Sequence, residues 1–148
     1  MKNGLVKSTK PRALIVDDSY TVQRHIRVAL SSLELDLDFA TNSKDAFTKI
    51  EEIDYDIVFL DVMLPGGMDG YSICKQIKNS KRTKRIPVIM LTSKDTSFDK
   101  VRGMMSGSNV YLTKPVNSKK LLEAVEKVAP SVCQSSSNQF NRLRTGTF

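Results

Sequence analysis

The chain of 148 residues has two cysteines, one histidine and no tryptophan, and it lacks any long apolar run. Cys74 and Cys133 do not have the spacing of a metal site, and we expect them to be free thiols. The longest apolar runs, such as Ala13–Val16, have four residues, whereas a helix that crosses a bilayer needs roughly 18. No apolar segment of signal-peptide length follows the basic N-terminus. We therefore expect a cytoplasmic protein that does not insert into a membrane.

The net charge of +7 would suit a nucleic-acid-binding protein, but its distribution argues against that class. Residues 1–12 carry four basic residues and no acidic one, and residues 130–148 carry two arginines and no acidic residue. The segment between them holds 17 basic and 16 acidic residues, so the excess positive charge lies at the two ends. We expect the basic run Lys81–Arg85 to be a solvated loop, and we expect no nucleic-acid partner.

Short apolar segments alternate with segments of helical periodicity through the central part of the chain. Continuous apolar runs predict strands buried on both faces, whereas residues 35–40 alternate apolar and acidic residues and predict a half-exposed edge strand. The other strands are expected at residues 12–16, 57–60, 88–91 and 110–112. Five strand–helix units in strict alternation predict an α/β fold, (βα)5, with a doubly wound parallel five-stranded sheet in the order 2-1-3-4-5, as in flavodoxin-like proteins.

This organisation predicts one domain over residues 12–129, with a loosely ordered arm at residues 1–11. Residues 130–148 begin at Pro130, which ends the last predicted helix, and are rich in Ser, Asn and Gln. We expect them to form a disordered polar tail. The sequence leaves open whether the chain is a fragment of a longer protein.

Polar residues follow the predicted strands at the point where each strand ends. Asp17 and Asp18 follow the first strand, Asp61 the third, Thr92 the fourth and Lys114 the fifth. In a doubly wound sheet, the carboxyl ends of the strands meet at one edge, and the site lies there. Three carboxylates in one pocket repel one another and favour a hard divalent cation such as Mg²⁺. The cation, a lysine and a hydroxyl group could together hold a phosphoryl group on Asp61.

These motifs resemble the receiver domain of two-component response regulators, over roughly residues 12–129. The resemblance rests on the Asp-Asp pair, on Asp61 with its Leu-Pro and Met-Asp-Gly continuation, on Thr92-Ser93 and on Lys114-Pro115. The segments Met90–Asp95 and Gly107–Pro115 are similar to those of CheY-like regulators of chemotaxis and twitching motility.

The resemblance implies the roles of the acidic residues. Asp61 would be the phosphoacceptor, and Mg²⁺ would be bound by Asp18, Asp61 and the backbone carbonyl of Met63. Asp17 would hold the metal through water. A histidine kinase or a phosphotransfer protein would donate the phosphoryl group.

The remaining matched residues would stabilise and transmit the modification. Lys114 would pair with the phosphoryl oxygens, and the Lys114–Pro115 bond would be cis. Thr92 and Tyr111 would form a switch pair, in which the hydroxyl turns toward the phosphate and the aromatic ring turns inward. The face made by the fourth helix, the fifth strand and the fifth helix would then change its affinity for an output protein. Dimerisation on phosphorylation stays open.

Two local features depart from the common pattern. The loop after Asp61 has Gly66-Gly67 where the family usually has one residue, which should loosen the loop beside the site. Met63 and Lys94 occupy the positions that tune how water reaches the acyl phosphate in this family. Because neither side chain is an acid or an amide, we expect slow self-dephosphorylation.

Alternative functions remain at this point. The chain could be a receiver-like interaction module with a non-phosphorylated site, although no acidic residue and no lysine of the motif is missing. A phosphoaspartyl hydrolase usually has a second aspartate two positions after the nucleophile, and Met63 stands there instead. We therefore expect no enzyme activity beyond the protein's own phosphorylation and dephosphorylation. His25, on the first predicted helix, is expected to be an ordinary helix residue rather than a phosphohistidine donor.

Overall fold

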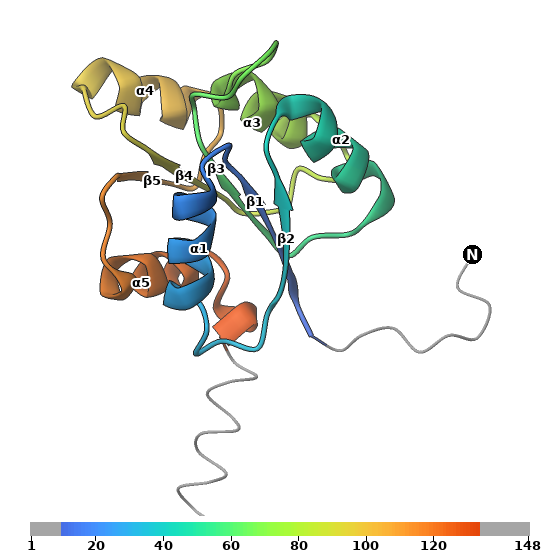
Figure 1. Ribbon diagram of the computed structural model, residues 1–148. Coiled ribbons are helices and arrows are strands. Elements are labelled where there is room, and N and C mark those ends of the chain that lie inside the picture. Colours follow the sequence, from blue (N-terminus) through green and yellow to red (C-terminus); the bar gives the residue numbers. More distant parts are fainter. Residues whose placement is uncertain (1–9, 134–148) are drawn as a thin grey trace, which may run out of the picture.

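A five-stranded parallel sheet in the order β2-β1-β3-β4-β5 forms the centre of the computed structural model, which describes residues 10–133 (Figure 1). The strands are β1 (Arg12–Val16), β2 (Asp36–Ala40), β3 (Ile57–Leu60), β4 (Val88–Thr92) and β5 (Val110–Thr113). The helices are α1 (Tyr20–Ala29), α2 (Ser43–Glu52), α3 (Gly70–Asn79), α4 (Ser97–Met105) and α5 (Ser118–Val128). The predicted (βα)5 fold and strand order are confirmed.

Burial follows the predicted pattern along β1, β2, β3 and β4, whereas β5, at the other edge of the sheet, is only half-buried at all four residues. Strands β3 and β4 are buried along their whole length, and β1 is buried from Ala13 onward. In β2, at one edge of the sheet, only Ala40 is fully buried, and Asp36 and Asp38 break the apolar pattern. A strand buried on both faces can be continuously apolar, whereas an edge strand that faces water alternates.

Every helix begins at a side chain that accepts a hydrogen bond from the backbone of its first turn. The capping residues are Ser19, Asn42, Asp69, Thr96 and Asn117. Such caps satisfy backbone N–H groups that have no partner within the helix, and each contributes about 1 kcal/mol. Caps follow β1, β2, β4 and β5 within four residues and leave short loops at the carboxyl edge of the sheet, whereas a longer loop, residues 61–69, leads from β3 to α3.

The helices form two layers around the sheet. Helices α1 and α5 lie side by side on one face, and α2, α3 and α4 lie on the other (Figure 1). Ile15, Phe59 and Ile26 belong to the core beneath α1 and α5, whereas Val58, Leu60 and Ile73 belong to the core beneath α2 and α3. No helix among residues 10–133 is both long and apolar enough to cross a membrane.

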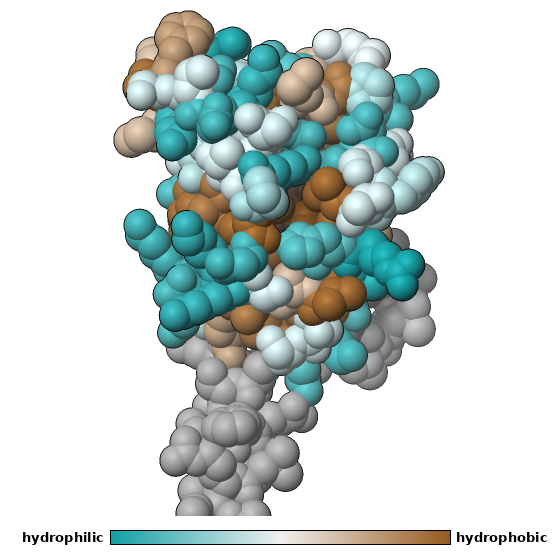
Figure 2. Space-filling view, turned by 60° about the vertical axis from the view of Figure 1, so that its left-hand side comes forward, coloured by the Kyte–Doolittle hydropathy of each residue, from teal (hydrophilic) through white to brown (hydrophobic). Residues whose placement is uncertain are grey.

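Helix α4 buries much less of its surface than the other helices. Of its residues only Gly103 is buried, and the exposed large apolar side chains on it are Phe98, Val101, Met104 and Met105. Figure 2 turns the side of α4, β5 and α5 toward the viewer and shows apolar side chains at the surface among polar ones. The exposed apolar side chains on this side of the molecule are therefore grouped on one helix, whereas single, scattered apolar residues are normal at a protein surface.

The chain continues as a helical turn after α5. Helix α5 ends at Val128, and residues 130–133 are again helical, with Val132 1% exposed and packed in the core beneath α1 and α5. The prediction of disorder from residue 130 onward is therefore wrong for residues 130–133, because one apolar side chain among polar residues is enough to anchor a turn. Most of the predicted arm and residues 134–148 of the predicted tail lie outside the described residues.

Candidate functional site

Strand register brings the predicted site residues to one edge of the sheet. Val16 pairs with Leu60, so that Asp17 and Asp61 are both the first residues after their strands. The Asp61 amide donates to the Val16 carbonyl at 3.0 Å, which fixes the two strand ends side by side. In the neighbouring strand pair of β4 and β5, Thr92 pairs with Thr113, and the Lys114 amide donates to the Thr92 carbonyl at 2.8 Å.

The three carboxylate side chains that were predicted to bind the metal lie together. Asp17, Asp18 and Asp61 each place one carboxylate oxygen within 4.8 Å of the others. Asp17 and Asp61 are buried, at 2% and 7% exposed, whereas Asp18 is exposed. Oxygen ligands on a rigid strand end, with one open side, suit a hard cation that keeps some of its water. The residues present therefore fit Mg²⁺.

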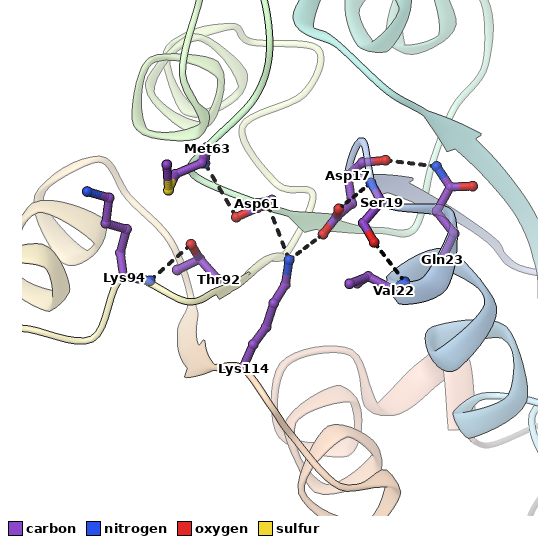
Figure 3. A network of polar contacts seen from close by, with 9 residues as sticks. All are labelled: Asp17, Ser19, Val22, Gln23, Asp61, Met63, Thr92, Lys94 and Lys114. Carbon is purple, nitrogen blue, oxygen red and sulfur yellow. Dashed lines mark hydrogen bonds and ion pairs between the residues drawn. The ribbon is translucent and has the colours of Figure 1, made fainter.

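Lys114 lies between two of these acids. Its ammonium nitrogen is 2.6 Å from Oδ2 of Asp17 and 3.2 Å from Oδ2 of Asp61 (Figure 3). The side chain of Lys114 is 20% exposed, so these are largely desolvated ion pairs. Burial lowers the pKa of Lys114, but the hydrogen bond to Asp17 and the charge of Asp61 outweigh burial and hold the pKa above its ordinary value. The ammonium is therefore a permanent positive charge at the site.

The pKa of Asp17 is set by a different balance of burial and hydrogen bonding. Burial raises its pKa above the ordinary value of an aspartate, and the hydrogen bonds from Lys114 and from the Ser19 amide offset that rise only in part. The neighbouring charge of Asp61 adds to the rise. The ionised form of Asp17 is thus held in an unfavourable environment, which a bound cation would relieve.

Gln23 is a site residue that the sequence analysis missed. Its side chain is buried, and its Nε2 donates to the backbone carbonyl of Asp17 at 2.8 Å (Figure 3). The Ser19 amide donates to Oδ1 of Asp17 at 2.9 Å from the start of the same helix. A signal was present, because Gln23 shares the buried face of α1 with Ile26 and Leu30 and interrupts an otherwise apolar pattern.

The loop after Asp61 folds back onto the acid. The Met63 amide donates to Oδ1 of Asp61 at 3.3 Å, and the Met63 side chain is 56% exposed. A Cβ atom at Gly70 would overlap with the carbonyl oxygen of Asp61, so a glycine is needed where α3 begins. Gly66 and Gly67 both have positive φ, 60° and 103°. Gly66 and Gly67 thus form a turn that residues with side chains would adopt only with strain.

Thr92 and Tyr111, the predicted switch pair, are joined through the backbone of Lys94. Thr92 is fully buried, and its hydroxyl oxygen accepts a hydrogen bond from the Lys94 amide at 3.3 Å (Figure 3). The Tyr111 hydroxyl donates to the Lys94 carbonyl at 2.7 Å. One residue of the β4–α4 loop therefore contacts both side chains, and movement of either would move this loop.

Two of the three acids, Asp18 and Asp61, line an open hollow. It has a volume of about 620 Å³, and its lining includes Asp18, Asp61, Met63, Lys94 and Arg102. His25 lies on α1 outside this hollow, and its Nε2 donates to the carbonyl of Val116 at 2.9 Å. The Lys114–Pro115 bond is cis, as predicted.

The fold and this site define a doubly wound α/β domain with an open acidic pocket at the carboxyl edge of its sheet. The family described as "Response regulator receiver domain" matches residues 13–126. The chain belongs to the response regulator receiver family. Receiver domains generally use Mg²⁺ at this acidic site and act with a histidine kinase or a phosphotransfer protein.

Similar proteins support a CheY-like receiver near the chemotaxis and twitching-motility type. PilG of Pseudomonas aeruginosa is 41% identical over 120 residues, which are 81% of this chain and 88% of that protein. The transcriptional regulatory protein ResD of Bacillus subtilis is 32% identical, and the match covers 88% of this chain but only 52% of that protein. The structure of the chemotaxis protein CheY4 of Vibrio cholerae has a TM-score of 0.74 and 26% identity, covering 81% of this chain and 99% of that one.

Proposed function

We propose that this protein accepts a phosphoryl group on Asp61 from a histidine kinase or a phosphotransfer protein, and that it then changes its binding to an output protein in the cytoplasm. The observation that carries the proposal is the grouping of Asp17, Asp18, Asp61 and Lys114 at one strand edge. Two buried acids with a permanently charged lysine between them form a site that can bind a cation together with an anionic group such as a phosphoryl group.

Asp61 is the nucleophile of the proposed reaction. One of its carboxylate oxygens attacks the phosphorus atom of a phosphohistidine or an acyl phosphate. The new O–P bond forms as the donor's P–N or P–O bond breaks, and the leaving group departs with the electron pair. Lys114 is already 3.2 Å from Oδ2 of Asp61, close enough to pair with the phosphoryl oxygens. The hydroxyl of Thr92, at the end of the next strand, can donate to them as well.

Four groups of the chain are the proposed ligands of Mg²⁺. Asp17, Asp18, Asp61 and the backbone carbonyl of Met63 would hold it, with Asp17 acting through water. The bound cation supplies positive charge against the phosphoryl oxygens and against the mutual repulsion of the three acids. The burial that raises the pKa of Asp17 favours the same occupant, because it makes an uncompensated carboxylate costly.

A groove next to Lys114 is a suitable position for the phosphodonor. It has a volume of about 520 Å³ and is lined mainly by apolar groups, among them Val22 of α1, Leu91 of β4 and Pro115. Helix α1 and the loop after β5 form its two sides. Lys114, which lines this groove, also pairs with Asp61, so a donor helix seated there would lie beside the acceptor.

The output response would use the side of the molecule that contains α4. Thr92 and Tyr111 are both tied to Lys94, and Tyr111 packs against α4. If Thr92 turns its hydroxyl toward the phosphoryl group, it gives up the Lys94 amide, and the loop that leads into α4 changes with it. The exposed apolar residues of this helix, such as Phe98 and Met105, would then present a changed surface to the output protein.

Intact-protein mass spectrometry after incubation with Mg²⁺ and acetyl phosphate tests the proposal. We expect a gain of one phosphoryl group that disappears in Asp61→Asn, which keeps the shape of the side chain but lacks the nucleophilic carboxylate. Asp54→Ala is a matched control, because Asp54 is an exposed acid that pairs only with Arg82 among the described residues.

The outcome also separates the proposal from its alternative. A wild-type protein that gains no phosphoryl group, while circular dichroism shows it to be folded, would indicate an interaction module with a non-phosphorylated site. A gain that persists in Asp61→Asn would place the acceptor elsewhere.

A further inference from the structure

Tyr71, in the first turn of α3, connects the predicted switch residue Tyr111 to α4. Its side chain is buried, at 6% exposed, although it carries a hydroxyl. That hydroxyl lies 3.1 Å from the backbone carbonyl of Asp99 in α4 and 3.3 Å from the hydroxyl of Tyr111 in β5. The Tyr71 hydroxyl therefore connects α3 both to α4 and to β5.

The assignment of hydrogens follows from the donors available. Each tyrosine hydroxyl has one proton to donate and can accept at its oxygen. Tyr111 donates its proton to the Lys94 carbonyl at 2.7 Å, the shorter of its two contacts. By the same criterion the single proton of Tyr71 lies on the Asp99 carbonyl at 3.1 Å. The contact of 3.3 Å between the two hydroxyl groups therefore shares a proton with one of these shorter bonds, and either tyrosine can be its donor.

Arg102 and Gly103 hold the same two rings from the side of α4. The guanidinium carbon of Arg102 lies 4.4 Å from the centre of the Tyr71 ring, a cation–π contact. A Cβ atom at Gly103 would overlap with the Tyr111 ring, so the ring lies directly against the backbone of α4. Burial raises the pKa of the Tyr111 hydroxyl, and its hydrogen bond with Tyr71 raises it further. The Tyr111 phenol is thus a neutral hydrogen-bonding group over the physiological range.

We propose that Tyr71 is a positioning residue of the switch, which anchors the first turns of α4 and sets the orientation of Tyr111 through the contact between their hydroxyl groups. This inference rests on the proposed function for its consequence, because the response of Tyr111 to phosphorylation is part of that proposal. The anchoring of α4 does not depend on it. Tyr71 adds a third side chain to the pair of Thr92 and Tyr111, and it comes from α3 rather than from β4 or β5.

The variant Tyr71→Phe removes the hydroxyl and keeps the ring and its contact with Arg102. We expect the amides of α4 to exchange with deuterium roughly fivefold faster than in the wild type, the effect of losing one hydrogen bond of ordinary strength. Tyr20→Phe is the matched control, because Tyr20 lies on α1 and is 78% exposed. Its α4 exchange should equal that of the wild type. Unchanged exchange in Tyr71→Phe would overturn the anchoring.

A double-mutant cycle tests the connection to Tyr111. Beryllofluoride with Mg²⁺ serves as the probe of the phosphorylated state, and its half-saturating concentration is followed by the NMR signals of α4. In the protein with the native Tyr111, we expect Tyr71→Phe to change this half-saturating concentration at least about threefold. In the Tyr111→Phe background, we expect the same substitution to change it by less than about twofold. A merely structural role of Tyr71 would give the same change in both backgrounds, and this result would overturn the inference.

The two experiments also distinguish the inference from the proposed function. If the wild-type protein neither gains a phosphoryl group nor responds to beryllofluoride, the proposed function fails. The exchange of the α4 amides would still decide whether Tyr71 anchors this helix.

Discussion

The ammonium group of Lys114 lies 2.6 Å from the carboxylate of Asp17, although the two residues are 97 positions apart in the sequence. Both follow directly on strands, on opposite sides of β3 and β4 in the sheet. Lys114 therefore reaches the acids from the β5 edge of the sheet, and its positive charge compensates two buried carboxylates. Removing Lys114, the cation of this group, leaves two uncompensated buried carboxylates, which costs more than the ion pairs themselves contribute.

The variant Lys114→Met tests this dependence. It keeps the length and apolar body of the side chain and removes the charge, so that Asp17 and Asp61 repel each other without compensation. We expect the free energy of unfolding in urea to fall by about 2 kcal/mol without Mg²⁺, less than for a fully buried pair because the site is open on one side. The deficit should shrink in millimolar MgCl₂. Lys120→Met, on the exposed surface of α5, should lose almost nothing, and an equal loss in both variants would contradict the argument.

Asp17→Asn should stabilise the metal-free protein. The pKa of Asp17 is raised in the folded state, so its ionised form lowers stability at neutral pH, and that penalty disappears as the pH falls through the raised pKa. We expect the variant to be more stable than the wild type by about 1 kcal/mol at pH 7. The difference in stability should narrow as the pH falls and the wild-type carboxyl also becomes neutral. Urea unfolding over a series of pH values measures this difference, and a difference that widens on acidification would show that the pKa is lowered instead.

The sheet and the acids were predictable from the sequence because both follow from local patterns. Continuous apolar runs are diagnostic of buried strands, and the residue after each run must lie at the carboxyl edge of a parallel sheet. Once the strand order is given, Asp17, Asp61 and Lys114 have to meet. The prediction therefore needed no knowledge of side-chain contacts.

The parts that were missed depend on contacts between elements. Tyr71 was not among the predicted site residues, because nothing in its spacing shows that its hydroxyl meets Asp99 and Tyr111. Lys94 was considered for its side chain, whereas its backbone amide and carbonyl make the contacts with Thr92 and Tyr111. The helical turn at residues 130–133 depends on one buried side chain, Val132, in a segment whose composition is typical of disorder.

Gly103→Ala should destabilise the protein, although alanine is the better helix former. In an exposed helix this exchange would stabilise by roughly 1 kcal/mol. Here the new methyl group would overlap with the Tyr111 ring, and overpacking costs typically 1–3 kcal/mol, so we expect a net loss of about 1 kcal/mol. Thermal unfolding measures the loss. Lys100→Ala, on the same helix, is the control, and the double variant Gly103→Ala with Tyr111→Ala should relieve the overlap; if it is no better than additive, the ring is not the cause.

Phosphorylated Asp61 should lose its phosphoryl group slowly, with a half-life of minutes or longer in the presence of Mg²⁺. Hydrolysis needs a water molecule aligned with the phosphorus atom, and a side chain that accepts a hydrogen bond from that water helps to align it. Of the two side chains at the mouth of the hollow, the Lys94 ammonium can only donate, and the thioether of Met63 is a weak acceptor. Met63→Gln supplies an amide oxygen at the same exposed position and should shorten the half-life severalfold. Met104→Gln makes the same exchange on the exposed face of α4 and should leave it unchanged. Decay of the phosphoryl mass over time gives both values, and a wild-type half-life of seconds would show that another group aligns the water.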